Sequence, residues 1–113
     1  MATEVASQDP SVVSRFFANR LDFDPYVPIL AGADLIGGRV CTIAGSKSQL
    51  LFYRLGDRKL SLYVMNQPVD AVSQCRQVGQ HHVCGRRHGP LSLVLVGDES
   101  DSALEELLKR AAL

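Results

Sequence analysis

The sequence predicts an α+β domain in which an antiparallel sheet of about five strands packs against one helix at each end of the chain. Three observations indicate this fold. Both ends carry apolar residues at helical spacing, the middle carries runs that alternate with period two, and glycine-containing turns separate those runs. A chain of 113 residues has the length of one domain. We expect residues 11–113 to form it, after a flexible tail at residues 1–10.

The first helix is expected to start at Asp9-Pro10-Ser11, where a capping side chain precedes a proline in the first turn. Its apolar face comprises Val12, Val13, Phe16, Phe17 and Leu21. The helix must end before Pro25, because the residue before a proline disfavours the helical conformation. Residues 26–33 contain one further proline and a glycine, so they predict an extended connector.

A meander of three strands is expected next, over residues 35–43, 49–55 and 59–65. The first of these strands contains Gly37-Gly38. Glycines inside a strand indicate a bulge or a close approach of another backbone. Gly56-Asp57 is a two-residue hairpin signal between the second and third strands.

The next segment, residues 69–80, is polar with apolar residues at three-residue spacing, which predicts a short helix or an ordered loop. Residues 81–87 and 91–96 predict a pair of strands separated by the turn Gly89-Pro90. The second strand of this pair is apolar on both faces, so we expect it to be central in the sheet.

The last helix is expected to be capped by Asp98 or Ser100, and Ser102 with Glu105 has the spacing of a capping box. Its apolar stripe comprises Leu104, Leu107, Leu108 and Ala111. Lys109-Arg110 would complement the dipole at its C-terminal end.

Composition argues against several classes of protein. Twelve basic and twelve acidic residues give a formal net charge of zero, which argues against a nucleic-acid binder that relies on bulk basicity. The longest apolar stretch, Leu91–Val96, is far shorter than the roughly 20 residues that span a bilayer. The polar, acidic N-terminus does not resemble a signal peptide. Three cysteines are too few for a disulfide-scaffold fold, and their odd number leaves at least one unpaired.

The densest group of reactive side chains lies between residues 75 and 88. Thiolates and imidazoles can bind zinc or copper. The candidate metal ligands are Cys41, Cys75, His81, His82 and Cys84. Their spacing matches no recognised zinc pattern, and on a strand His82 and Cys84 would share one face while His81 lies on the other. The alternative is that the cysteines are small core residues and the histidines are surface polar groups.

Cys75 and Cys84 are also candidates for a disulfide, which would close a short loop and requires an oxidising compartment. Pairing of Cys41 with Cys84 across neighbouring strands is an alternative that the sequence leaves open. Cys84 with His82 or His88 could form a nucleophile pair, but neither a recognisable third member nor an oxyanion loop accompanies it. We therefore expect the chain not to be an enzyme.

Three other motifs have simpler structural explanations. Gly37-Gly38-Arg39 lacks the glycine spacing and the following helix of a phosphate-binding loop. Arg86-Arg87-His88 offers too few phosphate contacts to bind nucleic acid and suits a solvated hairpin tip. Asp57 lies in a turn, and the acids of residues 98–101 lie at a helix start, where negative charge is favourable.

A series of short motifs runs in order from Ser11 to Leu113. They are Val13-x-x-Phe16-Phe17, Leu21–Phe23, Pro28, Gly32–Cys41, Leu50–Tyr53, Lys59–Val64, Val83-Cys84 and Leu93–Asp98, followed by the last helix. In this order they resemble the extracytoplasmic C-terminal domain of bacterial transmembrane anti-sigma factors, and Gly32–Cys41 is the most distinctive block. Members of that group often carry an aromatic residue, commonly Trp, where this chain has Gly85-Arg86-Arg87.

The resemblance implies a regulatory role. The full-length protein would sequester an extracytoplasmic-function (ECF) sigma factor through a cytoplasmic zinc-binding part that this sequence lacks. A single membrane helix would place the present domain on the periplasmic face, where a signal would influence release of the sigma factor. We expect an excised sensor domain rather than a stand-alone relative. The expected signal is metal binding or thiol oxidation at the cysteine and histidine cluster.

Two other classes are alternatives to this expectation. The first is an interaction module that binds a protein partner or a second copy of itself, with no ligand at the cysteines and histidines. The second, ranked third overall, is an enzyme that uses a cysteine and a histidine.

Overall fold

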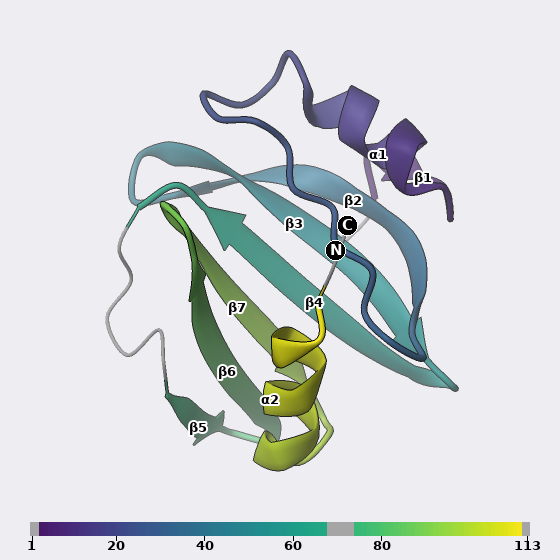
Figure 1. Ribbon diagram of the computed structural model, residues 1–113, viewed down its shortest axis with the longest axis vertical. Coiled ribbons are helices and arrows are strands. Elements are labelled where there is room, and N and C mark those ends of the chain that lie inside the picture. Colours follow the sequence, from purple (N-terminus) through teal and green to yellow (C-terminus); the bar gives the residue numbers. More distant parts are fainter. Residues whose placement is uncertain (1–2, 68–73, 112–113) are drawn as a thin grey trace.

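The computed structural model describes residues 3–67 and 74–111 of the chain (Figure 1). Within these residues there are two helices and seven strands. In chain order they are β1 (Val5–Ala6), α1 (Pro10–Phe17), β2 (Asp34–Ile43), β3 (Ser46–Leu55), β4 (Arg58–Met65), β5 (Cys75–Val78), β6 (His81–His88), β7 (Leu91–Gly97) and α2 (Asp101–Lys109). The α+β class is confirmed, and the expected number of about five strands is corrected to seven.

All strands belong to one antiparallel sheet with the order β1-β2-β3-β4-β7-β6-β5. The predicted meander is β2-β3-β4, and β5-β6-β7 forms a second meander. The two meanders join where β4 pairs with β7, so β7 lies between two neighbours as its apolar sequence predicted.

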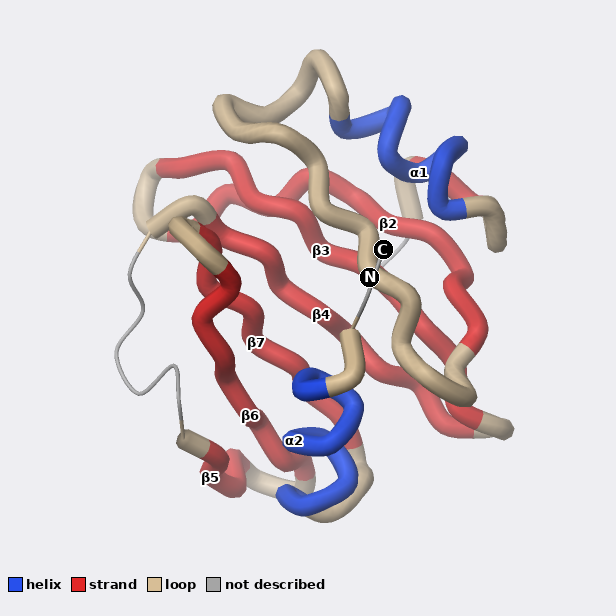
Figure 2. The backbone as a smooth tube through the Cα atoms, viewed as in Figure 1, coloured by secondary structure: helices blue, strands red, loops and turns tan. Residues whose placement is uncertain are grey.

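One face of the sheet carries the main core. Leu51, Leu62, Leu95 and Cys84 are aligned across β3, β4, β7 and β6 on this face, and all four are fully buried. Figure 2 shows α1, the connector that follows it and α2 on this same side of the sheet. The core cluster contains residues from all three of these segments together with the strands.

The helices cover the two ends of the sheet rather than its centre, which differs from the expected arrangement. α1 packs on β1 and β2, and α2 packs on β5, β6 and β7. The connector covers the middle. Gln49 of β3 accepts a hydrogen bond from the Tyr26 amide (2.8 Å) and donates one to the Tyr26 carbonyl (3.1 Å), and the Tyr53 hydroxyl donates to the Pro28 carbonyl at 2.6 Å. A polar core side chain thus fixes a segment that has no regular structure of its own.

Helix α1 begins as predicted and ends early. Asp9 is the N-cap, and its carboxylate accepts the Ser11 amide at 2.9 Å. The helix stops at Phe17, and Leu21 lies beyond it in a turn that includes a bond from the Arg20 amide to the Phe17 carbonyl. Leu21, the last residue of the predicted apolar face, therefore does not belong to the helix.

The glycine pair in β2 has both predicted features. The β2–β3 register shifts between Leu35 and Gly37, which marks a bulge. Gly37 has φ of 156°, and a Cβ there would collide with the Val5 carbonyl of β1. Residues 1–10, expected to be a flexible tail, thus contribute β1, and the Glu4 carboxylate accepts the Val40 amide at 2.8 Å.

Residues 75–78 form an edge strand, so the predicted helix or ordered loop over 69–80 is wrong for this part, while 68–73 lie outside the described residues. The three-residue spacing that indicated a helix does not mark a buried face, because Val78 is 55% exposed. Pairing with β6 provides the hydrogen bonds that fix these residues as a strand.

Helix α2 is capped by Ser100, whose hydroxyl accepts the Ala103 amide at 3.2 Å. The predicted capping box of Ser102 with Glu105 is wrong, because Ser102 already lies inside the helix. Leu104, Leu107 and Leu108 are buried against the sheet as predicted.

Candidate functional site

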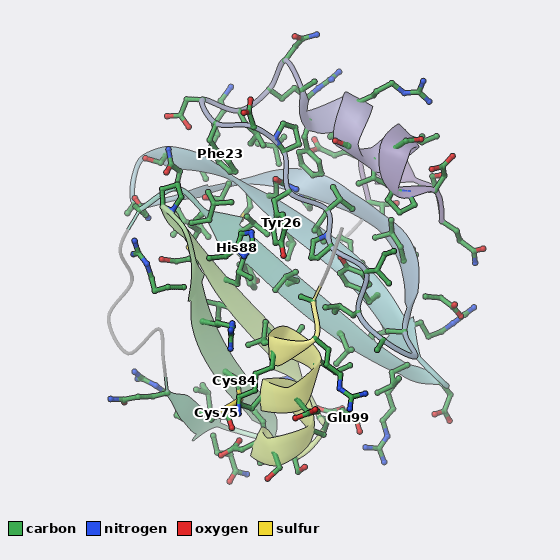
Figure 3. All side chains as sticks on the ribbon, in the orientation of Figure 1. Phe23, Tyr26, Cys75, Cys84, His88 and Glu99 are labelled. Atoms are coloured by element: carbon green, nitrogen blue, oxygen red, sulfur yellow. A yellow bond between two sulfur atoms is a disulfide. The ribbon has the colours of Figure 1, made fainter. Side chains whose placement is uncertain are left out.

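The candidate site is built around a disulfide between Cys75 and Cys84. The two residues face each other directly in the β5–β6 register, which brings their side chains together on the core face of the sheet. Cys84 is fully buried and Cys75 is partly exposed. Figure 3 shows the pair beside α2. Of the two pairings left open by the sequence, the structure has the one within residues 75–84, and Cys41 is a free thiol.

The first residue of α2 contacts both sulfur atoms. The backbone oxygen of Asp101 lies 3.5 Å from Cys84 Sγ and 3.8 Å from Cys75 Sγ. A carboxylate oxygen of Asp101 and the two sulfurs all lie within 4.8 Å of one another. One residue of α2 thus meets the disulfide with both its main chain and its side chain.

His82 holds the Asp101 side chain in place. Its Nδ1 lies 2.7 Å from Asp101 Oδ1, a short hydrogen bond. His82 and Cys84 are two positions apart on β6, so they share one face as the sequence predicted, and the structure shows that this is the core face. The side chains of His82 and Asp101 are 27% and 48% exposed, so the cluster is open to solvent on their side.

Two of the predicted metal ligands lie apart from this group. Cys41 is in β2, which β3, β4 and β7 separate from β6. It pairs in register with Ser48, whose face of the sheet is the opposite one to that of Leu51 and Cys84. His81 points away from the face of Cys84, and its Nδ1 lies 2.9 Å from Asp98 Oδ1. The structure therefore brings together Cys75, Cys84 and His82.

The residues weighed as a nucleophile pair have other partners. Cys84 Sγ is bonded to Cys75, so in this state it is not a thiolate. His88 stacks on Tyr26 with ring centroids 4.4 Å apart, at the far end of β6 (Figure 3). The His82 ring is bound to Asp101.

The remaining charged motifs have structural partners. Arg87 donates to the Ser92 hydroxyl (3.4 Å) and to the Gly89 carbonyl (3.5 Å), consistent with an ordered hairpin tip. Glu99 lies 3.3 Å from the Arg58 guanidinium. The acids at the start of α2 thus pair with side chains on the sheet, in addition to complementing the helix dipole.

Sequence reasoning missed Asp101 as a site residue, because an acid in the first turn of a helix already has an ordinary explanation. A signal was nevertheless present. β6 and β7 form a hairpin, so the helix that follows β7 returns over β6 and brings its first turn near Cys84. Without the β5–β6 register, the nine positions between the cysteines do not show that the two residues face each other.

In comparisons with known proteins, no family model matches this chain and no curated protein matches it at a significant level. Neither helix among the described residues is long and apolar enough to cross a membrane.

Proposed function

We propose that this chain is an extracytoplasmic sensory domain of a transmembrane anti-sigma factor, and that the Cys75–Cys84 pair is its signal-responsive element. The ordered motifs from Ser11 to Leu113 support the class of protein. The observation that carries the proposal is the disulfide, which contacts the first residue of α2. Disulfides form and persist in oxidising compartments, and the space outside the bacterial inner membrane is one of them.

The position of the disulfide supports a sensory role. It fastens β5, an edge strand of four residues, to β6, and it touches α2 at the same point. Breaking the bond would leave β5 held by pairing with β6 and by packing against α2, and would change what the start of α2 contacts. A redox signal would thereby favour one conformation of this end of the domain over another.

Thiol counting tests the redox part of the proposal. In air-equilibrated protein unfolded without reductant, we expect one reactive thiol, from Cys41, and three after reduction. Cys41→Ser should give zero and two. The folded protein should pass between the two forms reversibly in glutathione buffers of increasing ratio. Three thiols before reduction, or a bond that opens only when the domain unfolds, would contradict a sensory disulfide.

The reading frame of the gene tests the class of protein. We expect the codons upstream of Met1 to encode a membrane-spanning helix and, before it, an H-x-x-x-C-x-x-C segment. An in-frame stop codon immediately upstream of the start would exclude a membrane-tethered regulator. It would leave the redox chemistry of the pair as a separate property.

A second candidate function is a module that binds a protein partner or a second copy, and partly exposed apolar side chains on the face of the sheet opposite the main core favour it. Leu50 and Met65 are buried on this face, away from the main core. Phe52, Tyr63 and Val94 beside them are partly exposed. Light scattering of the reduced protein distinguishes the two candidates. A dimer that persists without the disulfide and is lost in Phe52→Asp would support the interaction module.

A further inference from the structure

We propose that reduction of the Cys75–Cys84 disulfide converts this cluster into a zinc site. The ligands are the two thiolates and the carboxylate of Asp101, and His82 is the positioning residue that holds the carboxylate. The inference rests on the proposed function in one respect, which is that the pair opens and closes while the domain stays folded. It adds a ligand class and a set of residues that the redox proposal does not contain.

The donor atoms are already close together. Cys75 Sγ, Cys84 Sγ and a carboxylate oxygen of Asp101 lie within 4.8 Å of one another. A tetrahedral zinc ion has Zn–S distances of about 2.3 Å and Zn–O distances of about 2.0–2.2 Å, so it spaces its ligand atoms by roughly 3.5–3.8 Å. Once the sulfur–sulfur bond is broken, side-chain rotation alone can bring three donors to this spacing.

The three ligands come from three elements that fix them against one another. Cys75 and Cys84 are paired in β5 and β6, and Asp101 begins α2, which packs on both strands. His82 Nδ1, 2.7 Å from Asp101 Oδ1, orients the carboxylate in the way that outer-sphere partners orient metal ligands. The donor set is therefore held in place before an ion arrives.

The chemistry of the donors selects the ion. Two thiolates favour zinc over magnesium or calcium, and a carboxylate oxygen is a common third ligand. Three protein ligands leave a fourth position for water. Asp101 and Cys75 are partly exposed, so an ion and its water can enter from their side of the cluster.

Oxidation and metal binding exclude each other at this site. A dithiol reductant gives two electrons and two protons to the disulfide, which becomes two thiols, while the reductant becomes a disulfide. Zinc binding then replaces two S–H bonds with two Zn–S bonds and releases two protons to solvent. Re-oxidation by a second disulfide, such as oxidised glutathione, transfers two electrons from the two thiolates to that disulfide, which takes up two protons and becomes two thiols, while the Cys75–Cys84 bond forms again and the zinc ion is released. The cluster thus has two alternative cross-links, one covalent and one through zinc, each joining β5 to β6.

The test is a zinc titration of the whole chain, reduced with dithiothreitol and freed of reductant under argon. We expect one zinc ion per reduced chain and no binding by the oxidised chain in calorimetry. With cobalt as probe, a thiolate-to-metal absorption band should appear in the reduced form alone. Cys84→Ser and Asp101→Asn should each weaken zinc binding by tenfold or more.

Matched control variants separate the site from its surroundings. His81→Ala and Asp98→Asn remove the neighbouring histidine–carboxylate pair on the other face of β6 and should leave zinc affinity unchanged, as should Cys41→Ser. His82→Ala should weaken zinc binding about tenfold. His82→Gln, which retains a side-chain donor, should restore part of it. A role of His82 in folding alone would lower the melting temperature of the metal-free protein without this pattern of rescue.

The outcomes distinguish this inference from the proposed function. A reduced chain that stays folded and binds no zinc, or one whose zinc affinity is the same in Asp101→Asn, overturns the zinc site and leaves the redox proposal standing. A disulfide that opens only on global unfolding overturns the redox proposal. If the reduced chain unfolds, one equivalent of zinc should restore its β-sheet circular dichroism. Failure to do so overturns the zinc site as well.

Discussion

Tyr53 carries a phenol hydroxyl into the centre of the core, where it donates to the Pro28 carbonyl at 2.6 Å. The side chain is 1% exposed, so the bond is made away from water. It links β3 to the connector at the point where no helix covers the sheet. Together with the two hydrogen bonds between Gln49 and Tyr26, this hydroxyl fixes the segment that closes the middle of the core.

Replacing Tyr53 with Phe should lower the free energy of unfolding by about 1–2 kcal/mol, because it removes this bond and leaves the Pro28 carbonyl buried without it. Urea denaturation at pH 7 measures the change. Tyr63→Phe is the matched control, because Tyr63 is partly exposed and lies on the face opposite the main core, and it should change stability by less than about 0.5 kcal/mol. Equal losses in the two variants would contradict the role assigned to the Tyr53 hydroxyl.

Ionisation of the buried Tyr53 phenol should also make the free energy of unfolding depend on pH in alkaline solution. Burial raises the pKa of Tyr53 well above its ordinary value, and burial also raises the pKa of Tyr26, where Arg86 opposes the effect. The folded chain keeps these phenols neutral, whereas the unfolded chain ionises them near pH 10. Their contribution to stability is therefore fully present below about pH 10 and is lost as the pH rises above it.

Urea denaturation at pH 9, 10 and 11 should show stability falling with pH in the native sequence. The fall should be shallower in Tyr53→Phe, because one of the linked ionisations is removed. Parallel pH profiles for the two proteins would contradict this account of Tyr53.

At the scale of the element, α2 shows how one hydroxyl sets a boundary. Ser100→Ala should cost about 1 kcal/mol, because the Ala103 amide loses its cap. Ser102→Ala should be neutral or slightly stabilising, since Ser102 lies inside the helix, where alanine is the better helix former. Thermal melts of the two variants measure the difference. A larger loss of stability in Ser102→Ala than in Ser100→Ala would contradict the assignment of Ser100 as the cap and favour the capping box of Ser102 with Glu105.

The disulfide gives a second prediction at this scale. Replacing both Cys75 and Cys84 with Ala should lower the free energy of unfolding by about 2–3 kcal/mol, because a cross-link over nine positions no longer restricts the unfolded chain. Amide hydrogen exchange should become faster in the double variant, with the largest increase in rate in β5. Cys41→Ala provides the control, and an equal loss of stability there would show that the effect comes from cysteine packing.

Elements with a local signature were predictable from the sequence. Gly56-Asp57 indicated the β3–β4 turn, Gly37-Gly38 indicated the bulge in β2, and Asp9 marked the start of α1. β1 and β5 were not predictable in the same way. Each is too short to show a period. β1 exists as a strand through pairing with β2, which is distant in the sequence, and the three-residue spacing of apolar residues around β5 indicated a helix instead.

Only the part of the candidate site that depends on residue type and local spacing was predictable. Residue chemistry singled out Cys75, His82 and Cys84, and the period of a strand placed His82 and Cys84 on one face. The contribution of Asp101 depends on how α2 crosses the second meander. The separation of Cys41 from the site depends on the order of strands across the whole sheet. Neither follows from local spacing.

At the scale of the whole molecule, six of the seven described strands form two meanders that meet along one seam, and β1 pairs with the outer strand of the first meander. α1 packs on β1 and β2, α2 packs on β5, β6 and β7, and the seam is the pairing of β4 with β7. Most contacts within each half are therefore close in sequence, while the seam closes a long loop and is expected to form late in folding.

This division has a consequence for how the chain can be assembled. Two separate polypeptides, residues 1–67 and 74–113, each contain the strands on which their own helix packs. Each lacks the strand across the seam and the side-chain contacts between the halves, such as the stacking of His88 on Tyr26. We expect them to be poorly ordered alone and to reconstitute the native spectrum when mixed, since each exposes a free strand edge that the other completes. Such complementation would show that folding is completed when the two half-domains recognise each other, and that this step does not require them to be joined in one chain.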